Sequence, residues 1–98
     1  MDITRNIKAI EWLKAELVSA LSYLFRATVK GGEEMILDAL ASLTVLTYVL
    51  ARRLGFSFAR LDMQVDRRLQ DGVEKGYEAE TWFGDLSALR EYRRKSMR

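Results

Sequence analysis

The 98-residue sequence contains no cysteine, no histidine and no proline. Without cysteine and histidine, the chain has no disulfide, no thiol nucleophile, no imidazole for acid–base catalysis and no zinc site of the usual kind. Any catalysis would therefore use carboxylates or the side chains of Lys, Arg, Tyr, Ser and Thr. The absence of proline removes the residue that most strongly breaks helices, so long helices are compatible with the whole chain.

The positive and negative charges of the chain are nearly balanced, which limits the kinds of partner that we expect. The formal net charge is +2, which is too small to attract nucleic acid through a chain-wide field. The C-terminal stretch 90–98 is basic, which suits either the end of a helix or contact with phosphates, but no nucleic-acid recognition motif accompanies it. The N-terminus lacks the pattern of a signal peptide. We therefore expect a cytoplasmic protein without nucleic acid as its partner.

Hydrophobic periodicity predicts an all-α fold within a single domain, residues 1–98. Apolar residues recur at three- and four-residue steps from Ile3 to Leu24, which is the spacing of one helical face. This pattern predicts a first helix over about residues 3–29, ended by Gly31–Gly32.

The second predicted helix runs from Glu33 to Leu54 and has no clear polar face. It contains thirteen consecutive uncharged residues, Ala39–Ala51. This run is too short to cross a bilayer, so membrane insertion is not expected. A helix that is apolar all round is buried all round, and a chain of this size can hardly enclose it alone. We therefore predict a homodimer, in preference to a monomer, with this apolar helix at its centre.

A third long helix and a short fourth one complete the predicted bundle. Apolar residues from Phe58 onward recur at helical spacing, and Ser57 before them is suited to be an N-cap. The stretch 77–84 is typical of a turn or a broken helix. Asp85 is suited to cap a short C-terminal helix over residues 86–95. The predicted fold is thus a helical bundle of three long helices plus a short C-terminal helix, dimerising through the second.

Asp38 is the charged residue that most needs an explanation. It follows Glu33 and Glu34 and immediately precedes the uncharged run. A carboxylate at the mouth of an apolar helix, if buried, must be paired, hydrogen-bonded, neutralised or bound to a metal, because an isolated charge is too costly there. Glu34 lies four residues earlier and shares a helical face with Asp38. Asp38 is the leading functional candidate, while Glu34 is either its partner or a structural acid in the first helical turn.

Two further acids show the same spacing on the third helix. Asp62 and Asp66 are four residues apart, and Asp62 borders the apolar stripe. They either complete a site or pair with nearby cations, for which Arg60, Arg67 and Arg68 are available.

Four segments, spread over nearly the whole chain, carry a family resemblance: DITRNIKAIEWLKAEL, EEMILDALASL, RRLGFSFARLD and WFGDLSAL. With these segments the chain resembles the MazG-like family of the all-α nucleoside triphosphate pyrophosphatase superfamily. The resemblance implies a dimeric or tetrameric helical bundle in which carboxylates of two neighbouring helices hold Mg²⁺ and the ion clamps a triphosphate. It also implies hydrolysis between the α- and β-phosphates, which releases a monophosphate and pyrophosphate.

The same resemblance implies metal ligands at Glu11 and Glu16 on the first helix and at Glu34 and Asp38 on the second. In the superfamily the acids of each helix are three residues apart. Here Glu11 and Glu16 are five residues apart, which places them about 140° from each other around the helix. Either of them could instead pair with a neighbouring cation at the surface.

Two functions of different classes follow. The first is a Mg²⁺-dependent nucleotide pyrophosphatase, or a degenerate relative that binds a nucleoside triphosphate without turnover. The second is a non-catalytic dimeric helical module that binds a protein partner. Convergence of the acids of the first helix with Glu34 and Asp38, to a distance at which they share a metal, would distinguish the first function from the second.

Overall fold

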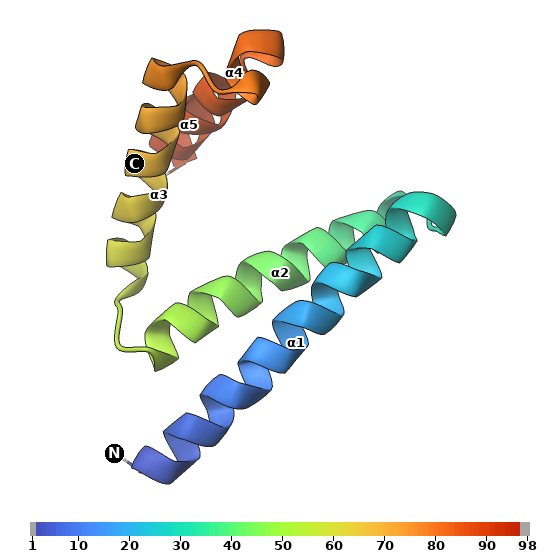
Figure 1. The fold of residues 1–98 in the computed structure, drawn as a ribbon, viewed down its shortest axis with the longest axis vertical. Helices are drawn as coiled ribbons and strands as arrows, with labels where there is room; N and C mark the ends of the chain where they lie inside the picture. The colour runs from blue at the N-terminus through green and yellow to red at the C-terminus, as the bar shows by residue number, and fades with distance from the viewer. Residues whose placement is uncertain (1, 97–98) are drawn as a thin grey trace. The chain divides into compact units, whose positions relative to one another are not determined.

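The computed structural model describes residues 2–96, except for the side chain of Ala79, and confirms the all-α fold (Figure 1). The described residues form the helices α1 (Ile3–Lys30), α2 (Glu33–Arg53), α3 (Phe58–Lys75), α4 (Glu78–Phe83) and α5 (Asp85–Ser96). The three long helices and the short C-terminal helix correspond to those predicted. The six-residue α4 lies in the stretch predicted as a turn or a broken helix. The last two residues of the basic stretch, 97–98, lie outside the described residues.

Local sequence signals account for the helix ends. The Asp2 carboxylate accepts a hydrogen bond of 3.0 Å from the backbone N–H of Arg5 and so caps α1. Gly55 follows the C-terminus of α2 with a φ of 99°, a conformation that favours glycine. Asp85 was expected just before the last helix, but it is the first residue of α5. Such a shift of one residue is within the ordinary uncertainty of a helix end.

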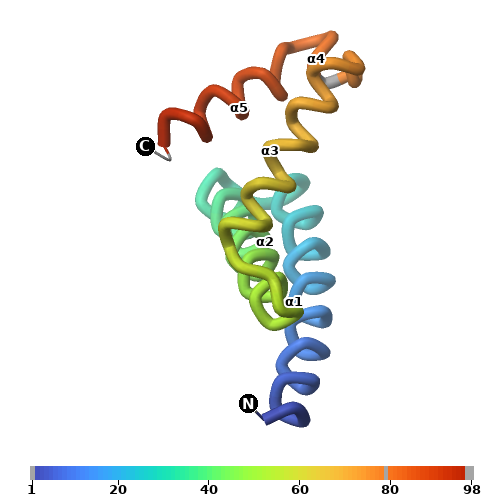
Figure 2. Tube along the Cα trace, turned by 90° about the vertical axis from the view of Figure 1, so that its left-hand side faces the viewer, coloured from blue at the N-terminus to red at the C-terminus, as the bar shows by residue number. Residues whose placement is uncertain are grey.

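The chain divides into two compact units: an N-terminal unit, residues 1–58, and a C-terminal unit, residues 59–98. In the N-terminal unit α1 and α2 form an antiparallel hairpin and lie side by side in both views (Figures 1 and 2). Ala27 and Ala39 are almost fully buried there. Because alanine is small, it allows two helix backbones to approach closely. Leu13 adds the largest buried side chain of α1.

The open end of the hairpin is held by a polar and an aromatic contact. The Asn6 side-chain amide donates a hydrogen bond of 3.1 Å to the backbone carbonyl of Arg53. The ring of Phe58 meets the Tyr48 ring edge-on, with 6.0 Å between centroids, and the Arg52 guanidinium lies 5.7 Å from the Phe58 centroid. These contacts connect the start of α1 and the residue after the loop to the last turns of α2.

Ion pairs connect helices of the C-terminal unit, in which Leu69 is also buried. The guanidinium of Arg93 on α5 lies 3.5 Å from the Asp62 carboxylate and 2.9 Å from that of Asp66, both on α3. The two acids that could have completed a functional site therefore pair with a cation of the same unit. The structure shows Arg93 as a pairing cation, which is not among the three arginines that the sequence analysis named, Arg60, Arg67 and Arg68.

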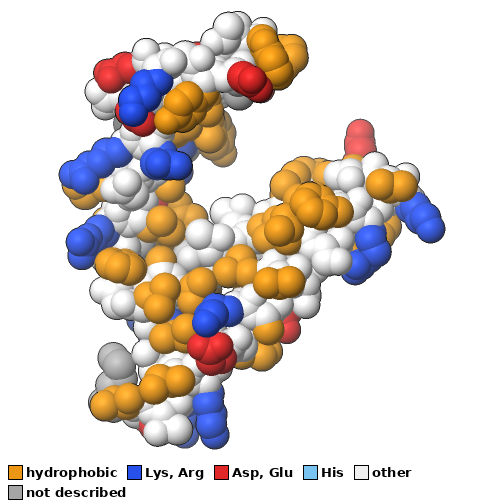
Figure 3. All heavy atoms as spheres, viewed as in Figure 1, with side chains coloured by type: hydrophobic (Ala, Val, Ile, Leu, Met, Phe, Trp, Pro, Cys, Tyr) orange, Lys and Arg blue, Asp and Glu red, His pale blue; other side chains and the backbone are white. Residues whose placement is uncertain are grey.

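The apolar surface of α2 remains largely uncovered in one chain. All of α2 is described, and of its residues Ala39 and Ala51 are buried, whereas the Leu37 residue is 61% exposed. Figure 3 shows apolar side chains gathering over α1 and α2 on the face in view. Among residues 2–96, α2 is the one helix that is long and apolar enough to cross a membrane, by length and composition only, and the core helix of a soluble protein can pass the same test. Burial of α2 in a homodimer stays a prediction.

Candidate functional site

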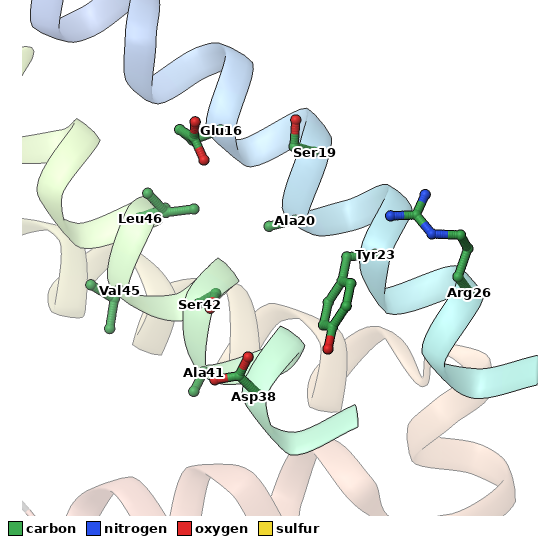
Figure 4. Close-up of a pocket in the computed structure, with 10 residues that line it drawn as sticks. All are labelled: Glu16, Ser19, Ala20, Tyr23, Arg26, Asp38, Ala41, Ser42, Val45 and Leu46. Carbon is green, nitrogen blue, oxygen red and sulfur yellow. The ribbon is translucent and has the colours of Figure 1, made fainter. Parts of the chain in front are cut away.

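A groove runs between α1 and α2 on one side of the hairpin (Figure 4). Small side chains form its central part, and these are Ser19, Ala20, Ala41 and Ser42. Larger side chains line the rest, and these are Glu16, Tyr23, Arg26, Asp38, Val45 and Leu46. The volume is about 710 Å³, within the range of roughly 300–1,000 Å³ typical of small-molecule sites. The groove exists because small residues face each other where the two helices pair.

The antiparallel pairing places the two groove carboxylates at different levels. Figure 4 shows Glu16 across from Leu46, whereas Asp38 lies near the level of the Tyr23 side chain. Leu46 and Asp38 are eight residues apart on α2, which corresponds to about 12 Å along the helix. Two oxygen ligands of one Mg²⁺ each lie about 2.1 Å from the ion, so they are about 4 Å apart at most. In a single chain, Glu16 and Asp38 line one groove at levels about 12 Å apart, so a shared ion would require both side chains to extend along the groove.

The other two predicted ligands lie outside the groove lining. Glu11 pairs with Lys14 on its own helix at 3.1 Å, and its side chain is 64% exposed. Glu34 is exposed in the first turn of α2, one turn before Asp38. Within residues 2–96 no group of three or more acidic side chains is arranged to hold a metal ion. The ligand role of Glu11, Glu16, Glu34 and Asp38 stays a prediction.

Tyr23 and Arg26 are polar groove residues that the sequence analysis did not identify. The Tyr23 ring points from α1 toward α2, with its hydroxyl at the α2 side of the groove (Figure 4). The Arg26 guanidinium donates a hydrogen bond of 2.6 Å to the Ser22 hydroxyl on the same helix. Both lie on the α1 side that carries Glu16, seven and ten residues further along. That these two residues line a groove follows from the pairing of α1 with α2, which the spacing within one helix does not show.

A model of the MazG-like family matches residues 3–86. The chain belongs to the MazG-like family. This confirms the resemblance carried by the four sequence segments. The family is of the nucleotide pyrophosphatase type and generally depends on Mg²⁺. Neither the comparison with curated proteins nor the comparison with solved structures gave a match.

The charged residues of the groove decide how well this MazG-like chain fits Mg²⁺. Its lining holds two carboxylates, Glu16 and Asp38, and one guanidinium, Arg26, which gives a formal charge of −1. Mg²⁺ is commonly bound by one or two carboxylates together with substrate phosphates and water, rather than by a cage made of protein alone. Asp38 and its neighbour Glu34 match the first arrangement. The residues of one chain fit an ion shared with phosphates and do not fit an ion enclosed by protein ligands.

Proposed function

We propose that this MazG-like chain binds Mg²⁺ together with a nucleoside triphosphate in the groove between α1 and α2. The observation that carries the proposal is the position of Asp38, which lines a ligand-sized groove on the second of the two helices that bear the predicted ligands. Asp38 and Glu34 would hold the ion, because they lie four residues apart on one face of α2. The bound ion would supply neutralisation of the phosphate charge.

Arg26 is the cation of the groove and would contact phosphate oxygens. A guanidinium offers paired N–H donors that match two oxygens of one phosphate. Its present hydrogen-bond partner, Ser22, lies one turn away on the exposed side of α1, so the exchange costs one surface hydrogen bond. The triphosphate would then lie at the end of the groove lined by Asp38, Tyr23 and Arg26.

The test is calorimetric titration of Mg²⁺, with and without a non-hydrolysable triphosphate analogue, into the wild type and into Asp38→Ala. We expect tight Mg²⁺ binding only when the analogue is present, because the phosphates complete the coordination. Asp38→Ala should weaken that binding at least about tenfold, since a charged contact is worth about 1.5–3 kcal/mol. Asp71→Ala, an acid of the C-terminal unit paired with Lys75, is the matched control and should bind like the wild type. Absence of heat from a folded wild type would contradict the proposal.

Hydrolysis of the bound nucleotide to a monophosphate and pyrophosphate is the reaction that we propose for this site. Among the described residues no third acidic side chain joins Asp38 and Glu34 in a group that could hold a metal ion. We therefore expect turnover to require a carboxylate from a second copy. The rate of pyrophosphate release per chain should then rise with protein concentration. Nucleotide binding without release at any concentration would identify a degenerate relative that binds only.

A second candidate function is supported by the exposed apolar surface. Val18, Phe25 and Leu37 are each more than half exposed on the long helices of the hairpin. A surface of this kind favours association with a second copy or with another helical protein. We propose that this surface forms the interface of a homodimer. Sedimentation velocity over a range of concentrations should show a dimer, and a persistent monomer would contradict it.

A further inference from the structure

The Tyr23 side chain extends from α1 across the groove toward α2. Its hydroxyl lies at the α2 side, and Asp38 lies near the same level (Figure 4). The residue is half-buried, so the helices fix the ring more closely than they would fix a side chain on the open surface. A ligand that reaches Asp38 through the groove therefore passes the Tyr23 hydroxyl.

The fold makes no use of this hydroxyl. It forms no hydrogen bond with any residue that the structure describes. A phenol hydroxyl that is shielded from bulk solvent usually has a hydrogen-bond partner, and here that partner must be water or a ligand. A phenylalanine ring would fill the same space between the helices, so packing alone does not account for a tyrosine at this position.

We infer that Tyr23 is a phosphate-binding residue, whose hydroxyl donates a hydrogen bond to a phosphate oxygen of the triphosphate held with Mg²⁺ at Asp38. This inference rests on the function proposed above and adds a contact from the opposite helix. The ligand is then held from both sides of the groove, by a carboxylate of α2 through the ion and by a phenol of α1 through the phosphate.

The chemistry of a phenol suits a site that binds a metal and phosphates together. Phosphate oxygens accept hydrogen bonds, and a hydroxyl can donate one, whereas the carboxylates of the groove cannot. A cation at the level of Asp38 would compete with Mg²⁺ for the carboxylate. The neutral hydroxyl of Tyr23 supplies a donor to the phosphate without this competition.

The position of Tyr23 on α1 agrees with this assignment. Tyr23 and Arg26 are three residues apart, so they project from neighbouring turns on one side of the helix, and both line the groove. Three residues correspond to about 4.5 Å along α1. A chain of phosphates that contacts the Tyr23 hydroxyl thus extends along the side of α1 that carries the guanidinium already assigned to phosphate.

The test removes the hydroxyl oxygen alone, with the variant Tyr23→Phe. Calorimetric titration with Mg²⁺ present would compare two ligands, inorganic tripolyphosphate and an α,β-methylene analogue of a nucleoside triphosphate. Because both ligands present phosphate, Tyr23→Phe should weaken the binding of both by about tenfold. Tyr92→Phe makes the same chemical change at a residue of α5 that is 67% exposed, and this control should bind both ligands like the wild type.

The pattern across the two ligands decides the outcome. A similar loss for both supports the contact with phosphate. Unchanged binding of both overturns the inference, and a loss confined to the nucleotide analogue also overturns it, because the hydroxyl would then contact the nucleoside. Any of these contrary patterns from a wild type that binds the analogue leaves the proposed function intact. A wild type that binds neither ligand overturns the proposed function as well.

Two further measurements separate a direct contact from an indirect effect. Without ligand, Tyr23→Phe should unfold within about 2 °C of the wild type, because the hydroxyl has no partner in the fold, and a larger drop would show a structural role. In the background of Asp38→Asn, Tyr23→Phe should still weaken tripolyphosphate binding by a similar factor. A loss that disappears in that background would make Tyr23 a positioning residue for the Asp38 carboxylate and overturn the phosphate contact.

Discussion

The two units of this protein use charged residues in different ways. In the N-terminal unit, α1 and α2 are held together mainly by apolar and small residues, with Leu13, Ala27 and Ala39 at their contact. The carboxylates of Glu16 and Asp38 are left in the groove, with no hydrogen bond to other described side chains of that groove. Cohesion of this unit does not depend on them.

In the C-terminal unit charged residues link the helices to one another. Arg93 joins α5 to α3 through Asp62 and Asp66. The Glu80 carboxylate on α4 accepts hydrogen bonds from both the backbone N–H and the hydroxyl of Ser87 on α5, at 2.9 and 2.7 Å. A carboxylate that already has such partners has few lone pairs to offer a ligand. The difference between the units therefore points to the groove of the N-terminal unit as the place for a ligand.

The largest effect that would test this comparison is expected from the apolar contact of the N-terminal unit. Leu13→Ala should lower the free energy of unfolding by about 3 kcal/mol, because it removes a buried side chain and leaves a cavity. Chemical denaturation followed by circular dichroism would measure this. Leu37→Ala makes the same chemical change at a residue that is 61% exposed, and in a monomer it should cost under about 1 kcal/mol.

The same control also tests the predicted homodimer. If a second copy covers Leu37, the cost of Leu37→Ala should rise with protein concentration, because association stabilises the folded state by mass action. A loss in Leu13→Ala no larger than that in Leu37→Ala at low concentration would show that the apolar contact does not hold the hairpin.

The next largest effect is expected in the C-terminal unit. Arg93→Met should lower the free energy of unfolding by about 2 kcal/mol, because Asp62, whose side chain is only 20% exposed, loses its ion pair. Arg90→Met changes an exposed arginine of the same helix and should have an effect within about 0.5 kcal/mol. If both variants are equally stable, the C-terminal unit does not depend on its ion pairs and the contrast between the units fails.

Much of the fold was predictable because it depends on local signals. Apolar spacing, the glycines after the helices and the lack of proline gave three long helices with ends close to those observed. The pairing partner of an acid was not predictable in the same way. Asp62 and Asp66 have the same spacing as Glu34 and Asp38, and no local pattern distinguishes the two pairs. The difference comes from Arg93, which lies 27 residues after Asp66 in sequence and is brought to it by the fold.

The candidate site was predictable only in part for a related reason. Asp38 and Glu16 both line the groove, as expected for functional acids. Their relative level depends on how α1 pairs with α2, which is set by the loop and by the alanines at the contact rather than by spacing within either helix. The sequence therefore identified two acids that line the groove, but it could not show how far apart they lie along it.

The smallest effect concerns a surface pair of the C-terminal unit and its dependence on pH. A hydrogen bond from Arg94 holds the pKa of the Glu91 carboxyl below its ordinary value of 4.5. Because the folded state binds this proton less readily than the unfolded state, the pair stabilises the protein above about pH 4.5 and this contribution is lost as the pH falls through the lowered pKa.

Thermal unfolding of the wild type and of Glu91→Gln should therefore differ slightly near neutral pH, with the wild type more stable, and converge in acid. The difference should also shrink with added salt, because the pair lies at the protein surface. A difference that is independent of both pH and salt would mean that Glu91 acts through packing and not through its ion pair with Arg94.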